Sequence, residues 1–93
     1  MSYLLFIEDC PVLENYKRGG YHCPDNKLSN CLNGNTPYAS LETAWKKCGE
    51  IEGCRKIMRW KSDRKFYLRR STDDYANDSN QYLDYTCQGK KLP

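Results

Sequence analysis

The chain has 93 residues, of which 39% are hydrophobic and 29% are charged, with six cysteines and a formal net charge of +3 at pH 7. A chain of this length forms a single domain, residues 1–93, whose hydrophobic core is close to the smallest that is stable unaided. The modest net charge and the many cysteines argue against a nucleic-acid-binding domain, which usually has a strongly basic surface.

The six cysteines indicate a second source of stability. An even number of cysteines in so short a chain is typical of a secreted protein with a disulfide framework. Each disulfide contributes about 2–4 kcal/mol, which is a large part of the stability of a small domain. A structural zinc site is the weaker alternative, because such sites use close pairs such as Cys-x-x-Cys and the sequence has none. We therefore expect an extracellular domain without a metal.

The first forty residues are predicted to be rich in loops. The apolar residues 3–7 predict a first strand, because they are too few for the hydrophobic region of a signal peptide. Met1 would then begin a mature fragment. From Gly19 to Pro37 the turn-forming residues glycine, proline, asparagine and aspartate recur, and only residues 20–23 favour a short extended piece.

A helix is predicted to begin after Ser40. The Ser40 hydroxyl can cap free backbone N–H groups, and Glu42 in the first turn complements the helix dipole. Four apolar residues then recur at helical spacing: Leu41, Ala44, Trp45 and Cys48. This stripe predicts that Trp45 lies in the core rather than in a binding site. Gly49 is expected to end the helix.

Two strands and a polar tail segment are predicted to follow. Gly53 turns the chain into a strand at residues 54–60, and a strand at 66–70 returns after a connection of hairpin length. The segment after residue 70 reads as a polar surface loop, in which Asn77 begins the N-glycosylation sequon Asn-Asp-Ser. Residues 81–87 predict a last strand, and residues 88–93 a tail or linker. No apolar run approaches membrane-spanning length, so we expect no membrane insertion.

The basic hairpin is the best candidate for a binding site. Between Arg55 and Arg70 there are eight basic residues and one acidic residue, Asp63. Arginine can hold sulfate or carboxylate groups through paired hydrogen bonds, and aromatic rings can stack on a sugar or on a partner's side chain. We therefore predict six ligand-binding residues: Arg55, Lys56, Arg59, Trp60, Tyr67 and Arg69. The alternative is a solvated strand surface whose charges only prevent aggregation.

The sequence contains no recognisable catalytic arrangement. A nucleophile needs a neighbouring base, and His22, the one histidine, adjoins Cys23, which we expect to be oxidised. Glu50 and Glu52 are expected to be solvated turn carboxylates rather than an acid/base pair. The aspartates after Arg70 lack the spacing of a calcium-binding EF-hand. We expect a protein that is not an enzyme and that has no cofactor.

The joint spacing of these residues resembles the PAN/apple family. The resemblance rests on Ser40-Leu41-Glu42-x-Ala44, Cys48, Cys54 and Phe66-Tyr67-Leu68-Arg69, and it does not extend to residues 11–38. It implies an α+β fold in which a single helix packs on a curved antiparallel β-sheet and disulfides stabilise the whole. The small collagen-binding antiplatelet proteins of leeches belong to this group, and they too end in a tyrosine-containing strand that closes on a cysteine.

The resemblance also implies a disulfide pairing. Cys48–Cys54 would join the helix to the first hairpin strand, and Cys10–Cys87 would join the two ends of the chain. Cys23 and Cys31 are left over and would pair with each other. A further bridge of many family members falls here on Ala44 and close to Phe66, so an apolar contact is expected in its place. Sequence alone leaves other pairings open.

The functional expectation follows from the family as well. PAN domains mediate protein–protein and protein–carbohydrate contacts. The resemblance thus implies a secreted binding or adhesion module for an extracellular protein or acidic carbohydrate, alone or within a larger protein. The alternative is a disulfide-rich effector, such as a toxin or a protease inhibitor, that acts through the loop between Cys23 and Cys31, which carries Lys27. Nucleic acid is not expected as a partner.

Overall fold

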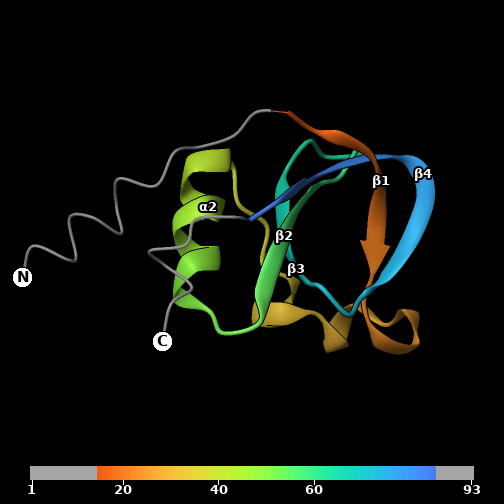
Figure 1. The fold of residues 1–93 in the computed structure, drawn as a ribbon, viewed down its shortest axis with the longest axis horizontal. Coiled ribbons are helices and arrows are strands. Elements are labelled where there is room, and N and C mark those ends of the chain that lie inside the picture. The colour runs from red at the N-terminus through yellow and green to blue at the C-terminus, as the bar shows by residue number, and fades with distance from the viewer. Residues whose placement is uncertain (1–14, 86–93) are drawn as a thin grey trace, which may run out of the picture.

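The computed structural model describes residues 15–85, which form one helix and a four-stranded antiparallel sheet. The elements in chain order are β1 (Lys17–His22), the 3-10 turns η1 (Pro24–Asn26), η2 (Leu28–Asn30) and η3 (Leu32–Asn35), α2 (Leu41–Glu50), β2 (Cys54–Arg59), β3 (Phe66–Arg70) and β4 (Asp74–Asp84). The strand order is β1-β4-β2-β3, and α2 lies beside β2 and β3 (Figure 1). The fold class is therefore α+β, as predicted. The predicted strand at 3–7, the tail at 88–93, Cys10 and Cys87 lie outside the described residues.

The helix begins as the sequence predicts and ends one residue later. Ser40 has an extended backbone, and its hydroxyl accepts a hydrogen bond of 3.2 Å from the Thr43 N–H. The prediction that Gly49 ends α2 is wrong, because the helix continues through Glu50. The left-handed backbone that requires glycine occurs at Gly53 instead, where φ is +90° in the turn before β2.

The Ser40 cap gives a testable contribution to stability. We expect Ser40→Ala to lower the free energy of unfolding by about 1 kcal/mol, because one N–H group at the start of α2 loses its acceptor. Ser40→Asp should retain the wild-type stability. Urea denaturation followed by circular dichroism measures both, with Ser71→Ala at an exposed turn position as the control. Equal losses for Ser40→Ala and Ser71→Ala would show that the cap has no effect.

The core lies between α2 and the sheet. It consists of nine buried residues: Leu32, Ala44, Trp45, Cys48, Cys54, Ile57, Leu68, Leu83 and Tyr85. The predicted helical stripe thus faces the core, with Leu41 half-buried at its margin. The Trp45 ring lies against Tyr85, with 4.5 Å between centroids, and Phe66 packs on the cluster that contains Ala44. Within the described residues, no helix is long and apolar enough to cross a membrane.

Two disulfides connect neighbouring elements. Cys48–Cys54 ties the end of α2 to the start of β2, and both cysteines are 0% exposed. Cys23–Cys31 closes the segment that contains η1 and η2. These are the same two pairs that the family resemblance implies. The first disulfide belongs to the core, and the second holds the loop-rich segment against the sheet.

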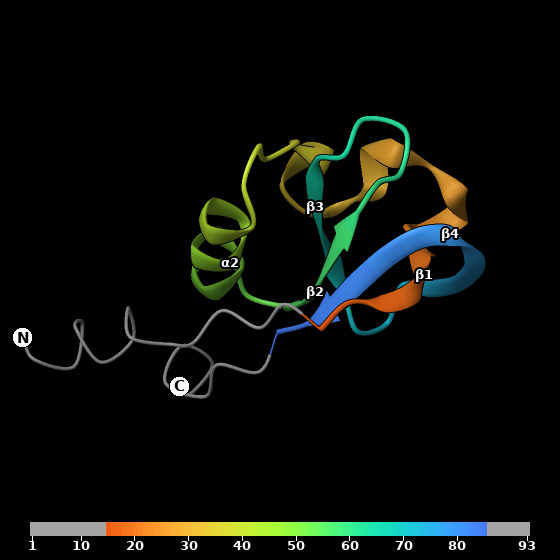
Figure 2. The same ribbon diagram turned by 90° about the horizontal axis from the view of Figure 1, so that it is seen from above.

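The sheet is strongly curved because β4 bends around a wide bulge. Arg18 pairs with Gln81 and Gly20 pairs with Ala76, so the single residue Gly19 faces residues 77–80 of β4. The Gly19 φ is +121°, and a Cβ there would stand 2.5 Å from the Tyr75 ring. Figure 2 shows β4 curving from β2 toward β1, on the side away from α2. One side of the sheet is thus covered by α2, and the other side is concave.

Two strands extend beyond their predicted limits. β1 begins at Lys17 rather than residue 20, and β4 begins at Asp74 rather than residue 81. The prediction of a surface loop around Asn77 is therefore wrong, although the Asn77 side chain is exposed as a glycosylation site requires. The first half of β4 is polar and does not alternate, so its strand conformation comes from pairing with β1 rather than from its own sequence pattern.

Candidate functional site

The six residues predicted to bind a ligand do not form one outward face. Arg55 is exposed, Arg59 and Lys56 are half-buried, and Trp60 is 36% exposed. Tyr67 and Arg69 are only 5% and 3% exposed, so these two residues are not on the outer surface of the hairpin. The physical reason is that β1 and the 3-10 turns cover the concave side of β2 and β3.

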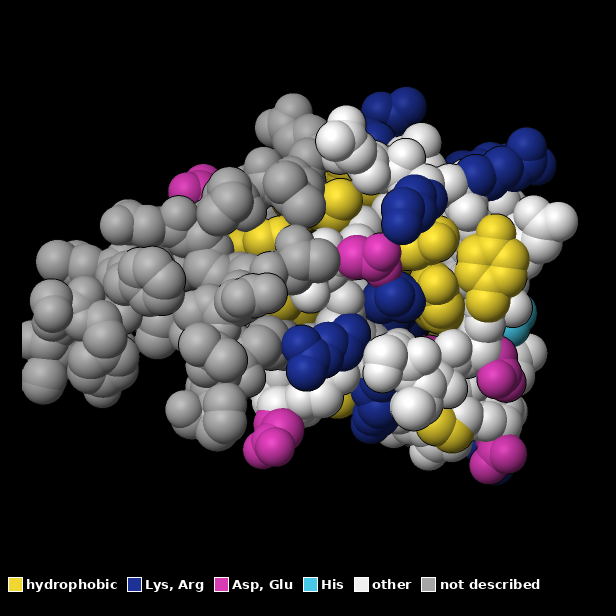
Figure 3. Space-filling model, in the orientation of Figure 1, with side chains coloured by type: hydrophobic (Ala, Val, Ile, Leu, Met, Phe, Trp, Pro, Cys, Tyr) yellow, Lys and Arg dark blue, Asp and Glu magenta, His cyan; other side chains and the backbone are white. Residues whose placement is uncertain are grey.

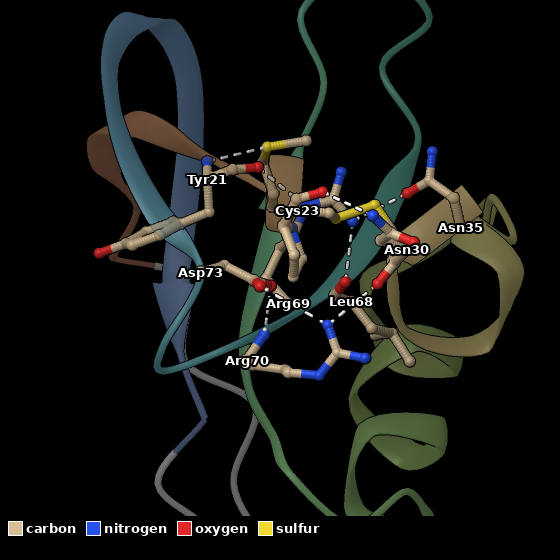
Figure 4. The surroundings of a disulfide bond; sticks show 11 residues. Tyr21, Cys23, Asn30, Asn35, Leu68, Arg69, Arg70 and Asp73 are labelled. Carbon is tan, nitrogen blue, oxygen red and sulfur yellow. Dashed lines mark hydrogen bonds and ion pairs between the residues drawn. A yellow bond between two sulfur atoms is a disulfide. The ribbon is translucent and has the colours of Figure 1, made fainter. Parts of the chain in front are cut away.

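Arg69 is held in place by neutral acceptors from three elements (Figure 4). Its Nε donates to the Tyr21 carbonyl of β1 at 2.9 Å, and its Nη1 donates to Asn35 Oδ1 and to the Leu68 carbonyl, both at 2.8 Å. Burial lowers the pKa of Arg69 to about 10, an effect that the nearby Asp73 carboxylate partly opposes. The guanidinium is therefore still charged at neutral pH, and it joins β3 to β1 across the concave side.

The Tyr67 side chain is also engaged inside the protein. Its hydroxyl donates a hydrogen bond to Asp63 Oδ2, and Asp63 Oδ1 accepts from the Lys65 N–H at 2.9 Å. Burial raises the pKa of Tyr67 to about 12, and the hydrogen bond to the Asp63 carboxylate adds to this effect. The single acidic residue of the hairpin is consequently occupied by internal donors and forms no ion pair with a basic side chain of the described residues.

Lys56 belongs to a tyrosine cluster formed by Tyr21, Tyr75 and Tyr82, whose rings meet edge to face with centroids 4.9–6.2 Å apart. Its Nζ lies 5.4 Å from the Tyr21 ring centroid and 2.6 Å from Asp84 Oδ1. Figure 3 shows hydrophobic side chains grouped beside basic and acidic ones over the β1 and β4 part of this face. Lys56 is thus neutralised within the protein and is not available as a free cation.

Asp84 is the anion that balances this cluster. Burial alone would raise the pKa of its carboxyl, but hydrogen bonds from Lys56 and then from Lys17, 3.0 Å away, lower the pKa below its usual value. The carboxylate is therefore ionised at neutral pH and bridges two lysines. Both lysines are thus engaged by the same carboxylate, which leaves one positive charge in excess but no lysine without a partner.

A shallow hollow at the tip of the hairpin, which we call the basic groove, does hold unpaired charge. It has a volume of about 140 Å³ and is lined by six residues: Arg59, Trp60, Lys61, Arg64, Ser79 and Gln81. None of its three cations forms an ion pair within residues 15–85. The Lys61 N–H donates to Asn80 Oδ1 at 2.7 Å, which fixes the hairpin tip to β4. Arg59 and Trp60 of the predicted set thus remain together in one site.

A larger hollow, which we call the central cleft, lies on the other side of β4. Its volume is about 300 Å³, and its lining includes Tyr21, Met58, Arg69 and the Cys23 disulfide. Asp78 and Asn80 line the central cleft whereas Ser79 and Gln81 line the basic groove, as expected for side chains that alternate along a strand. Two large, exposed apolar side chains also line the cleft: Leu28, 58% exposed, and Trp60.

The central cleft could not be located from the sequence. Leu28, Asn35 and Asn80 belong to three segments that the sequence presents as unrelated polar loops, and only the folded chain brings them together. The one available signal was Trp60, an aromatic residue next to a polar turn. Lys61 and Arg64 of the basic groove lay in the predicted basic run but were not singled out, because the strand pattern does not extend to them.

No cluster suited to metal binding occurs in the described part of the chain. Among residues 15–85, no three histidine, cysteine or acidic side chains are close enough to hold a metal ion. His22 is exposed beside the central cleft, and the adjoining Cys23 is in a disulfide. That the protein is not an enzyme stays a prediction. The chain matches no protein-family model, no curated protein and no solved structure.

Proposed function

We propose that this protein is a secreted, non-enzymatic binding module of the PAN/apple type that recognises an acidic carbohydrate through the basic groove. The observation that carries the proposal is the convergence of Arg59, Lys61 and Arg64 on one hollow without any acidic partner among residues 15–85. Elsewhere on the hairpin, Lys56 and Arg70 do have such partners. Unpaired cations around a concave surface favour the binding of a polyanion.

The chemistry of the groove suits sulfate and carboxylate groups. An arginine guanidinium offers parallel N–H donors to such anions, and a lysine ammonium adds a mobile point charge. The Ser79 hydroxyl and the Gln81 amide can bind sugar hydroxyl groups, and the partly exposed Trp60 ring offers a surface on which a sugar can stack.

Two further observations support the PAN/apple assignment and the extracellular location. A single helix packs on an antiparallel sheet and is tied to its first hairpin strand by Cys48–Cys54, as in that family. The described residues contain two disulfides, which persist in oxidising compartments. The partner would be an extracellular glycan, or a protein that displays acidic groups, and the module could act alone or within a larger protein.

The effector alternative also has a structural basis. The Cys23–Cys31 disulfide and the turns η1 and η2 make a compact loop with Lys27 exposed. Protease inhibitors use exposed, rigid loops of this kind. A panel of serine proteases and ion channels that are unaffected by the protein would exclude this alternative.

The proposed function predicts that heparin binding depends on particular cations. We expect Arg59→Gln combined with Lys61→Gln to weaken binding of a heparin hexasaccharide roughly tenfold or more, because two charged contacts are lost. Isothermal titration calorimetry at physiological salt measures the change. The matched control is Arg55→Gln with Lys46→Gln, which removes the same charge from exposed positions outside the groove. Equal losses in the two double variants, or no binding by the wild type, would contradict the proposal.

A further inference from the structure

We propose that the central cleft is a second binding site, specific for a sugar that carries a carboxylate, and that Arg69 is its anion-binding residue. The inference deepens the proposed function, since it names one chemical group of the acidic carbohydrate and gives it a place separate from the basic groove. Three features of the cleft carry it: the bonding of Arg69, the fixed position of its guanidinium, and the polar groups around it.

The guanidinium of Arg69 has unmet bonding capacity. Three of its five N–H donors are taken by the Tyr21 carbonyl, Asn35 Oδ1 and the Leu68 carbonyl, all of them neutral. No described acceptor meets Nη2, and no described carboxylate lies within 4.0 Å of the guanidinium. A buried cation with no carboxylate in direct contact is only partly compensated by the more distant Asp73, so an anion delivered by a ligand to Nη2 would be bound favourably.

The nearest acidic side chain is not available to fill this role. The Asp73 carboxylate accepts a hydrogen bond of 2.7 Å from the Arg70 N–H and lies 3.6 Å from the Arg70 guanidinium. Arg70 Nη1 in turn donates to the Asn30 carbonyl at 3.1 Å (Figure 4). Asp73 Oδ1 accepts no hydrogen bond from the described residues, and the ion pair of Asp73 is with Arg70. Asp73 therefore acts on Arg69 only as a nearby charge more than 4.0 Å away, without a direct contact.

Arg69 is also held ready for a ligand before any ligand arrives. Its side chain is 3% exposed and is fixed by hydrogen bonds to β1, β3 and η3, and it lines the cleft. The Tyr67 ring supports it from 5.8 Å away. Binding to a group that is already immobile avoids the entropy cost of ordering a flexible side chain. The three cations of the basic groove, whose side chains form no hydrogen bond with the described residues, lack that advantage.

The remaining lining selects a sugar rather than a simple organic acid. Asn26 and Asn80 contribute amide groups to the lining. The two carboxylate oxygens of Asp78 accept hydrogen bonds from the Asn80 N–H at 2.9 Å and from Asn80 Nδ2 at 3.2 Å. Each oxygen keeps a further lone pair that can accept from a sugar hydroxyl. Trp60 contributes a flat apolar surface at the opening. At about 300 Å³ the cleft is at the small end of ligand sites, a size suited to one sugar ring rather than to an extended chain.

Three hexasaccharides test the inference: heparin, carboxyl-reduced heparin, which keeps its sulfates, and hyaluronan, which has carboxylates and no sulfate. We expect carboxyl reduction to weaken binding roughly tenfold. Hyaluronan should bind and shift the Leu28 methyl resonances in NMR, because Leu28 lines the cleft and not the groove. Asn26→Asp adds a carboxylate at the cleft without changing side-chain size, and its φ of +54° is tolerated by aspartate. It should weaken hyaluronan binding at least fivefold, whereas Asn77→Asp outside the cleft should not.

The outcomes separate this inference from the proposed function. If Arg59→Gln/Lys61→Gln weakens heparin binding while carboxyl-reduced heparin binds as well as heparin and hyaluronan does not bind, the basic groove is retained and the cleft is rejected. If hyaluronan binds and is sensitive to Asn26→Asp while the groove variant has no effect, the cleft is retained and the groove is rejected. Hyaluronan binding that Asn26→Asp and Asn77→Asp affect equally also rejects the cleft.

Discussion

Replacing Ile57 by alanine is expected to lower the free energy of unfolding by about 2–5 kcal/mol, a large part of the stability of a small domain. Ile57 is 0% exposed and lies on β2 between its paired residues Leu68 of β3 and Leu83 of β4. Since β2 is hydrogen-bonded on both edges and tied to α2 by the Cys48–Cys54 disulfide, its backbone cannot move to fill the resulting cavity.

Two variants calibrate that loss. Ile57→Val removes one methylene and should cost about 0.5–1.5 kcal/mol, and Leu28→Ala, at a position 58% exposed, should change stability by less than about 0.5 kcal/mol. Urea denaturation followed by circular dichroism gives all three values. A loss for Ile57→Ala no greater than that for Ile57→Val would show that this part of the core collapses around a vacancy, contrary to the close packing described.

The helix and the hairpin could be predicted because their signals are local. A cap at Ser40 and an apolar stripe at helical spacing identify α2 within ten residues. A glycine turn followed by two short segments that mix apolar and basic residues, joined by a polar connection, identifies β2 and β3. Each of these patterns indicates which side of the helix or strand is buried. The apolar side of the helix and that of the hairpin must both be buried, so the two elements are expected to pack against each other around one core.

The other half of the sheet could not be predicted in this way. β1 contains Gly19 and Gly20, which normally weaken a strand, and the first half of β4 is a polar sequence without alternation. Both become strands through contacts between distant residues. The Tyr75 ring fills the space over Gly19, and its hydroxyl donates a hydrogen bond of 3.1 Å to the Arg18 carbonyl. These two residues are 57 positions apart in the sequence, so no local pattern predicts their contact.

Contacts between distant residues also explain why the sequence did not show that Tyr67 and Arg69 are buried. Alternation along β3 correctly separates Tyr67 and Arg69 from the residues that face α2, but it cannot tell whether that second side meets solvent or protein. The cover is supplied by β1 and the 3-10 turns, whose own sequence gave the weakest prediction. The hairpin could therefore be predicted as a charged element, whereas which of its cations are exposed could not be predicted.

Removing the Cys48–Cys54 disulfide, by Cys48→Ala with Cys54→Ala, is the second variant expected to have a large effect, a loss of about 3–5 kcal/mol. The loop is short, because its cysteines are separated by only six positions in the sequence, so loop-closure entropy accounts for about 2–3 kcal/mol of this loss. The remainder comes from the folded state, because both sulfurs are replaced by empty space in the core between α2 and β2.

Cys23→Ala with Cys31→Ala is the informative comparison, because its loop is of similar length and its entropy term is therefore similar, about 2–3 kcal/mol. Neither cysteine belongs to the core cluster, so no further core loss is expected. Because Cys23 lines the central cleft, the folded variant should lose hyaluronan binding while heparin binding persists at the groove. Urea denaturation and calorimetry on both double variants measure this. Equal stability losses would show that Cys48–Cys54 contributes no more to the core than Cys23–Cys31 does. Unchanged hyaluronan binding would show that Cys23–Cys31 does not determine the shape of the cleft.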